Sequence, residues 1–147
     1  MTINRRAFVI SAGAASGLTS LNALATVADA TQAANQILGS KKASVGRVTL
    51  VIPPLVENGN LVTMKVSVES PMTPADHVQA IHIVAEGNPL PNVVSFYLSS
   101  RSGRADITTR IRLGDSQRVL AIAHMSDGSF WQGDASTLVT IAACAEV

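Results

Sequence analysis

The sequence predicts an all-β protein, an antiparallel sandwich of about seven short strands. Residues 62–69 and 106–113 alternate apolar with polar side chains, the period of a strand with one buried and one solvated face. Turn-forming clusters rich in Gly, Pro, Asn and Asp recur every 8–12 residues or so, with no helical pattern between them. With 147 residues, 47% of them hydrophobic, the chain is long enough to bury one core.

The composition excludes several classes of protein. Eleven basic residues against ten acidic ones give a formal charge of +1, without the basic stripe that nucleic-acid binding requires. The apolar fraction is too high, and the charged fraction of 14% too low, for a disordered chain or a coiled coil. One cysteine, Cys144, excludes a disulfide scaffold.

The first thirty residues have the layout of an export signal. The pair Arg5-Arg6, followed by Ala7-Phe8-Val9, resembles the twin-arginine signal, and the chain then carries no charge until Asp29. Ala28-Asp29-Ala30 fits cleavage after Ala30, with Ala23-Leu24-Ala25 as a second choice. The alternative is an uncleaved membrane anchor, although the many Ser, Gly and Thr residues make a poor spanning segment. A mature protein exported to the periplasm is expected.

After the signal, residues 31–43 predict a short helix and linker, with the helix over Thr31–Leu38 ending at Gly39. Residues 44–141 predict the sandwich, and residues 142–147 a C-terminal arm. Asp127-Gly128 separates two apolar runs and predicts a two-residue hairpin. The predicted strands are Val45–Ile52, 62–68, Val78–Ala85, Val93–Leu98, 107–113, Arg118–Met125 and Thr137–Ala142.

A search for catalytic or metal chemistry finds little. No phosphate-binding glycine loop follows a strand, and the three histidines lack zinc-ligand spacing. A blue-copper site is disfavoured, because its cysteine precedes a His and a Met in the closing loop, and only Ala145-Glu146-Val147 follow Cys144. Of the three histidines, His77, His82 and His124, the last two are expected on solvated strand faces. The large aromatic side chains after the signal are expected in core or interface packing; they are Phe96, Tyr97, Phe130 and Trp131.

Cys144 is the exception. A cysteine without a partner in an exported protein indicates an intermolecular disulfide or a reactive thiol. The predicted strand over 137–141 would fix the chain, and three extended residues at about 3.3 Å each would carry the thiol roughly 10 Å beyond it. A thiol on such a stalk can enter another protein's active site. An inert cysteine against the sandwich edge is an equal alternative on spacing alone, and a disulfide-linked homodimer is compatible with the reactive-thiol reading.

A family resemblance favours the exposed thiol. The segment Ile81-His-Ile-Val-Ala-Glu86-Gly-Asn-Pro-Leu-Pro91-Asn-Val-Val-Ser-Phe96 resembles a characteristic stretch of SoxY, the sulfur-carrier subunit of the bacterial thiosulfate-oxidising system. Thr109-Arg-Ile-Arg-Leu-Gly114, then Val119-Leu-Ala-Ile-Ala123 and Asp127-Gly128, is similar to the family's next hairpin. Leu50-Val-Ile-Pro53 and Glu57-Asn-Gly59 also fit. The likeness covers most of residues 45–144.

The resemblance implies an immunoglobulin-like sandwich in the periplasm, paired with a smaller β-sandwich subunit, SoxZ. In that family the C-terminal cysteine holds the sulfur substrate covalently, which assigns that role to Cys144. A haem enzyme (SoxXA) loads thiosulfate, a hydrolase (SoxB) releases sulfate, and further enzymes process the remaining sulfur. The carrier is not itself an enzyme and needs no cofactor.

The arm departs from the family pattern. The family's arm is typically Gly-Gly-Cys-Gly-Gly, whereas Cys144 is flanked by Ala142-Ala143 and Ala145-Glu146-Val147. Alanine adds a methyl group and loses glycine's access to positive φ. Negative charge at Glu146 and the terminal carboxylate disfavours the thiolate, so a weaker nucleophile is expected. The alternative function is therefore a non-loading binding or assembly subunit that has lost carriage.

Overall fold

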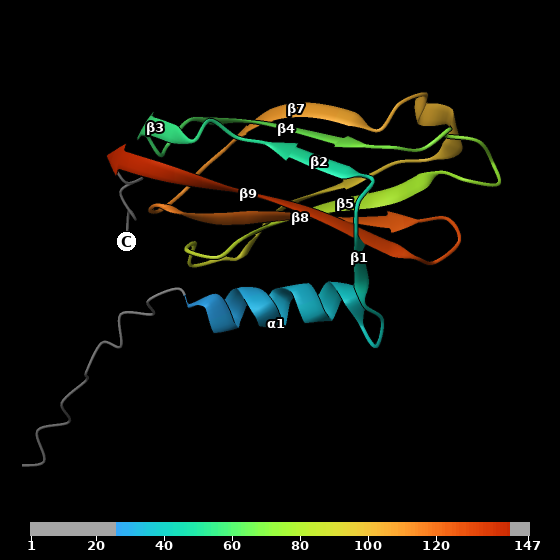
Figure 1. Ribbon diagram of the computed structural model, residues 1–147, viewed down its shortest axis with the longest axis horizontal. Helices are drawn as coiled ribbons and strands as arrows, with labels where there is room; N and C mark the ends of the chain where they lie inside the picture. Colours follow the sequence, from blue (N-terminus) through green and yellow to red (C-terminus); the bar gives the residue numbers. More distant parts are fainter. Residues whose placement is uncertain (1–25, 142–147) are drawn as a thin grey trace, which may run out of the picture.

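The computed structural model describes residues 26–141, which form a two-layered β-sandwich with one helix packed beneath it (Figure 1). The predicted twin-arginine pair Arg5-Arg6 and the arm residues 142–147, Cys144 included, lie outside the described residues. The elements are α1 (Val27–Leu38), β1 (Ala43–Val45), β2 (Val48–Val51), β3 (Leu55–Asn58), β4 (Val62–Val68), β5 (Val78–Ala85), β6 (Asn92–Tyr97), a 3-10 turn (Ser100–Ser102), β7 (Asp106–Ile111), β8 (Gln117–Met125) and β9 (Phe130–Ile141).

The strands form two sheets. The larger has the order β1-β9-β8-β5-β6, with β3 also paired to β9, and the smaller has the order β2-β4-β7. The smaller sheet packs on one face of the larger and α1 covers the other face (Figure 1). The predicted all-β, immunoglobulin-like fold is confirmed. The described residues hold nine strands, however, and β1 and β3 run parallel to β9, so the sandwich is mixed rather than wholly antiparallel.

The predicted strand over Val45–Ile52 was wrong as a single element. Gly46 has φ 125° and Arg47 φ 56°, so the chain turns between β1 and β2. A side chain at Gly46 would be strained at that φ, which is why the turn falls there. The turn sends β1 to the edge of the larger sheet and β2 to the edge of the smaller one, although the apolar run through both reads as continuous.

Strand β9 is much longer than the predicted Thr137–Ala142. It begins at Phe130 and pairs with β8 as far as Thr137 and with β3 from Leu138 to Ile141. Gly133 and Asp134 both have a low propensity for β-strands, so the sequence did not predict a strand there. The structure explains Gly133, because a β-carbon there would overlap the backbone carbonyl of Val48 on the facing sheet. The glycine permits a close approach of the two sheets where β9 crosses β2.

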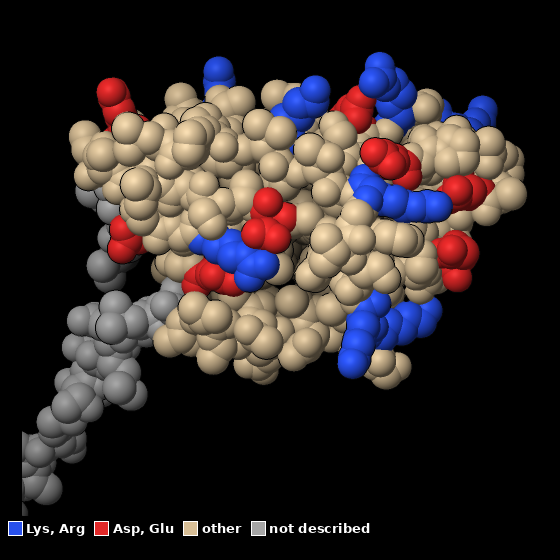
Figure 2. Space-filling view, viewed as in Figure 1, with Lys and Arg blue, Asp and Glu red and all other residues tan. Residues whose placement is uncertain are grey.

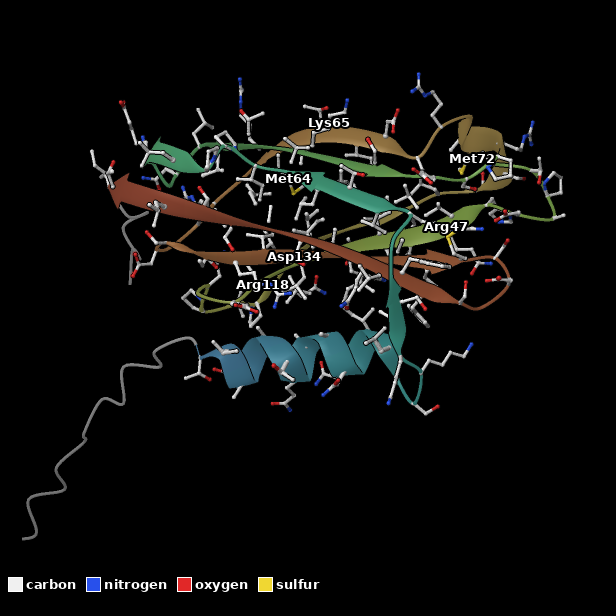
Figure 3. All side chains as sticks on the ribbon, in the orientation of Figure 1. Arg47, Met64, Lys65, Met72, Arg118 and Asp134 are labelled. Carbon is white, nitrogen blue, oxygen red and sulfur yellow. The ribbon has the colours of Figure 1, made fainter. Side chains whose placement is uncertain are left out.

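The core lies between the sheets. Met64, Ile81 and Leu113 are fully buried there, and Figure 3 places Met64 between the layers while Lys65 points away from them. This is the alternation predicted for residues 62–68, and it is confirmed. Charged side chains are scattered over the face shown in Figure 2 without a basic stripe. A second apolar cluster, which includes Ala30, Ile122 and Phe130, joins α1 to the outer face of the larger sheet.

Helix α1 begins four residues earlier than the predicted Thr31. Thr26 is its N-cap, with Asp29 completing a capping box: the Thr26 backbone N–H donates to the Asp29 carboxylate at 3.0 Å, and the Asp29 N–H donates to Thr26 Oγ1 at 3.3 Å. Ala30, the predicted last residue of the signal, is only 3% exposed. Among residues 26–141, no helix has the length and apolar character needed to cross a bilayer.

The hairpin predicted at Asp127-Gly128 is confirmed in place but has a longer loop. The backbone N–H of Met125 donates to the Ser129 carbonyl at 2.9 Å, so three residues, Ser126 to Gly128, form the connection. The N–H of Ser129 donates to the Asp127 carboxylate at 2.8 Å and orders the turn. Three-residue connections of this kind are the next most frequent after two-residue ones.

Candidate functional site

The end of β9 is fixed to the sandwich immediately before the predicted arm. On one side it pairs with β3, placing Leu55 beside Leu138 and Asn58 beside Ile141. The backbone N–H of Gly59 donates to the Ile141 carbonyl at 2.9 Å, and that of Leu138 donates to the Pro54 carbonyl at 2.9 Å. Ile141, the last described residue, is therefore held by a hydrogen bond from the body of the protein.

Side chains secure the same strand end. Thr137, which is 3% exposed, donates its hydroxyl to the Pro53 carbonyl at 2.6 Å. Thr140 donates to the Glu57 carbonyl at 3.1 Å. On the opposite side of β9, the hydroxyl of Ser116 accepts from the Val139 N–H at 2.8 Å, where the ladder with β8 has ended. We call the segment 137–141 the arm root. It is anchored along both edges.

The arm root has an unusually apolar exposed surface. Leu138 is 63% exposed, Ile141 is 63% exposed, and Leu55 is 58% exposed. Leu55 and Leu138 are register partners, so their side chains lie on the same face of the β3–β9 pair. The tip of β9 and β3 lie together at one end of the molecule (Figure 1). Such a pair of exposed leucines at the base of the predicted arm is a candidate contact surface.

The geometry restricts where Cys144 can act. Cys144 follows Ile141 by three residues, and an extended chain advances at most about 3.3–3.6 Å per residue. The sulfur is therefore confined to a region about 10 Å in radius around the end of β9, plus the length of its own side chain. The placement of Cys144 and of the arm residues Ala142, Ala143, Ala145, Glu146 and Val147 lies outside the described residues.

The histidines do not assemble with the arm root. His82 and His124 lie on the outer face of the larger sheet, on β5 and β8. His82 Nδ1 is 2.7 Å from Ser95 Oγ, and the His124 ring stacks on Phe130 with centroids 4.5 Å apart. Partial burial, and secondarily the nearby His124, lowers the pKa of His82. The expectation of a solvated face was wrong for both, since both are half-buried.

His77 lies apart from this pair, where its Nδ1 is 3.0 Å from the Thr73 carbonyl oxygen. Within residues 26–141, no group of three or more His, Cys, Asp or Glu side chains is arranged to hold a metal ion. No acid, base and nucleophile set is brought together by the described residues around the arm root.

The aromatic residues divide between packing and exposure. Phe130 is buried under α1, and Phe96 and Trp131 are half-buried against the main core, as the sequence predicts. The Arg47 guanidinium stacks over the Trp131 ring at 5.1 Å. Tyr97 is 79% exposed at the end of β6, which leaves it free for an interface.

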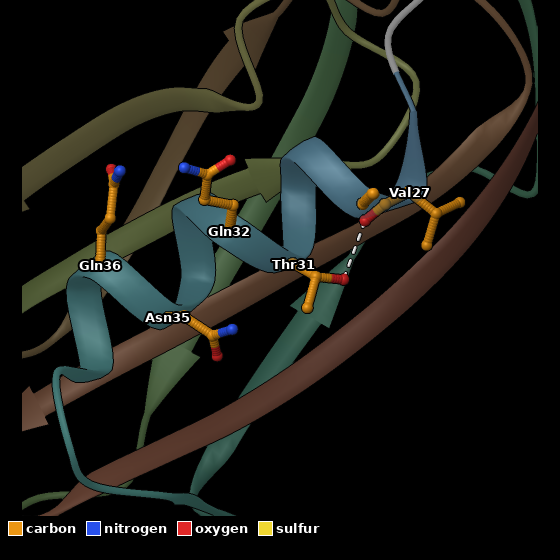
Figure 4. Close-up of a pocket in the computed structure, with 6 residues that line it drawn as sticks. Val27, Thr31, Gln32, Asn35 and Gln36 are labelled. Atoms are coloured by element: carbon orange, nitrogen blue, oxygen red, sulfur yellow. Dashed lines mark hydrogen bonds between the residues drawn. The ribbon is translucent and has the colours of Figure 1, made fainter.

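One open surface hollow lies along α1 (Figure 4). It is lined by Val27, Ala28, Thr31, Gln32, Asn35 and Gln36, and the Thr31 hydroxyl is already engaged with the Val27 carbonyl at 2.8 Å. The hollow is open, carries no charged side chain, and offers no convergent polar groups for a ligand.

Comparison with known proteins identifies the family. The family model "Sulfur oxidation protein SoxY" matches residues 34–144, three quarters of the sequence and the whole sandwich. The chain belongs to the SoxY family. The match extends through the arm root to Cys144. No curated protein matches.

Solved structures support the fold of this SoxY-family protein. The sulfur carrier protein SoxY from Chlorobium limicola f thiosulfatophilum aligns with a TM-score of 0.65 and 20% identity, over 78% of this chain and 96% of that one. A superoxide reductase (neelaredoxin) from Ignicoccus hospitalis aligns with a TM-score of 0.56 and 19% identity, over 64% and 80% of the two chains. A putative superoxide reductase from Thermotoga maritima aligns with a TM-score of 0.54 and 18% identity, over 67% of this chain and 87% of that one. At these identities the likeness shows a shared sandwich.

Sequence reasoning did not find the anchors of the arm root. Ser116 and Thr137 are ordinary polar residues in the sequence, and no strand was predicted at β3, because turn residues lie on both sides of Leu55-Val56. One signal was available: Leu55-Val56 lies between Pro54 and Asn58-Gly59, an apolar pair enclosed by turn residues. Two residues are too short a pattern to predict a strand.

Proposed function

We propose that this SoxY-family protein is a periplasmic, non-catalytic carrier that holds sulfur intermediates covalently on Cys144. The observation that carries the proposal is the arm root. A strand anchored on both edges ends at Ile141, and the family match continues past it by three residues to the cysteine. A thiol placed just beyond a fixed support is able to enter a partner's active site while the body stays outside.

The chemistry of loading is an oxidation that the carrier cannot perform alone. The Cys144 thiol and thiosulfate join through a new S–S bond, giving a cysteine S-thiosulfonate, one proton and two electrons. A haem-containing partner enzyme of the Sox system accepts the two electrons. A hydrolase then adds water across the terminal sulfur–sulfur bond, releasing sulfate and two protons and leaving a persulfide anion on Cys144. The carrier contributes the sulfur atom and its position.

The proposal includes export and pairing. The Arg5-Arg6 pair supports delivery by the twin-arginine route, which carries folded proteins into the periplasm. A small β-sandwich subunit of the SoxZ type is the expected heterodimer partner. Co-purification with that subunit, followed by measurement of the complex mass, tests the pairing independently of cargo.

Intact-mass analysis of the mature protein from sulfur-grown cells tests carriage. A reductant-labile adduct is expected on the wild-type chain, absent from Cys144→Ser. Ser44→Ala serves as a matched control, because Ser44 is exposed on β1 opposite Trp131, at the other end of β9 from the arm root. An unmodified thiol under all growth conditions contradicts carriage.

The second candidate is a binding or assembly subunit that no longer loads sulfur. The replacement of the family's glycines by alanine on both sides of Cys144 favours it, because a stiffer and bulkier arm is harder to thread into a narrow channel. This candidate predicts that the chain still binds its small β-sandwich partner while Cys144 stays unmodified. Restoring glycine at positions 142, 143 and 145 would then restore loading.

A further inference from the structure

The reach of Cys144 fixes where an enzyme must sit to use it. The backbone of Cys144 can reach about 10 Å from the end of β9, because only three residues separate it from Ile141, and the sulfur extends beyond that by the length of its own side chain. The Ile141 carbonyl is bonded to Gly59, so the arm root does not extend that reach by peeling away. An enzyme that modifies Cys144 must therefore press its own surface against the end of the sandwich. This inference rests on the proposed function.

The size of such a contact determines which residues it covers. Specific interfaces bury about 600–800 Å² on each partner, a disc of roughly 15 Å radius. Leu138 is three strand residues from Ile141, which is about 10 Å along β9. Leu55 lies directly opposite Leu138 on β3. Both leucines fall inside a contact centred on the arm root.

The chemistry of this surface identifies which face the enzyme uses. Leu55 and Leu138 are both more than half exposed and face the same way, and the strand alternation puts Glu57 on that face beside them. The surface over this end of the molecule is mostly uncharged (Figure 2). An apolar centre with a polar border is the usual anatomy of a protein interface.

We propose that Leu55 and Leu138 form the docking surface for the enzyme that loads Cys144. The matching surface on that enzyme is an apolar rim beside the entrance to its active site, with a basic side chain facing Glu57. The leucine pair guides the enzyme to the side of the sandwich from which the short arm can enter.

The test uses the mature protein purified together with its small β-sandwich subunit, thiosulfate, and the purified haem-containing loading enzyme from the same organism in its oxidised form. Loading of Cys144 is followed by intact mass for wild type, Leu138→Lys, Leu138→Ala and Val45→Lys. Val45 is the matched control: it is 82% exposed and sits on β1 opposite Gln132 of β9. That position is nine residues from Ile141, or about 30 Å along the strand. Alkylation of Cys144 by iodoacetamide reports the thiol's own reactivity.

The expected result is a drop of at least tenfold in the loading rate at low carrier concentration for Leu138→Lys, a smaller drop for Leu138→Ala, and no change for Val45→Lys. Alkylation by iodoacetamide stays the same in all four proteins. Equal loading of wild type and Leu138→Lys overturns the docking surface and leaves the carrier function standing. A wild-type protein that alkylates but never loads overturns the carrier function and this surface with it.

Discussion

Replacing Thr137 with valine should loosen the arm root by a measurable amount. Thr137 is 3% exposed and donates its hydroxyl to the Pro53 carbonyl at 2.6 Å, tying β9 to the segment that leads into β3. Valine keeps the shape of the side chain, so no cavity forms and the loss is the hydrogen bond alone. A net loss of about 1 kcal/mol in the free energy of unfolding is expected.

Thr140→Val is the matched control on the same strand. Its hydroxyl also donates to a backbone carbonyl, that of Glu57 at 3.1 Å, but the residue is exposed and water replaces the bond. Its expected cost is below about 0.5 kcal/mol. Urea unfolding of the mature protein, monitored by Trp131 fluorescence, should show the Thr137→Val midpoint lowered by about 0.5–1 M. Equal midpoints for the two variants would refute the role assigned to burial.

Three further predictions concern the rest of the fold. Gly133→Ala should lower the free energy of unfolding by about 1–3 kcal/mol, because the new methyl group meets the Val48 carbonyl; an unchanged melting temperature would contradict this. If the signal is removed, cleavage after Ala25 keeps the Thr26 capping box and α1 intact, so mass spectrometry of the exported protein should find Thr26 at the amino terminus and not Thr31. Burial lowers the pKa of His82 in the folded protein, so the unfolded chain binds more protons below about pH 6.5; stability should fall as pH drops through that range, and less so in His82→Gln.

The arm and the arm root play different parts in the proposed carrier. The alanines beside Cys144 set how easily the thiol enters a channel, whereas the hydrogen bonds to Ile141 and Val139 fix where the arm starts. A change in the arm's flexibility does not compensate for a change in the hydrogen bonds that hold the arm root. The glycine-restored arm and the Leu138 variants therefore separate entry of the thiol from docking of the enzyme.

The sequence predicted those strands whose apolar pattern and flanking turns are visible in the local sequence. Residues 62–68 and 78–85 alternate or run apolar between clear turns, and the structure places strands there with the same bounds. Family membership was also within reach, because the ordered segments from Leu50 to Gly128 keep their spacing along the chain. Both depend on neighbours in the sequence, which a single chain displays directly.

Other features depend on contacts between segments far apart in sequence. Residues 130–136 read as a poor strand, but pairing with β8 outweighs the low propensity of Gly133 and Asp134, and the facing sheet requires the glycine. The short β3 becomes a strand only because β9 supplies partners more than eighty residues away. The sequence alone determined the all-β class and pointed to Cys144 as the residue of interest. Only the tertiary structure decided how the chain is held just before it, since the hydrogen bonds and the exposed leucine pair there exist only once β3, β8 and β9 meet.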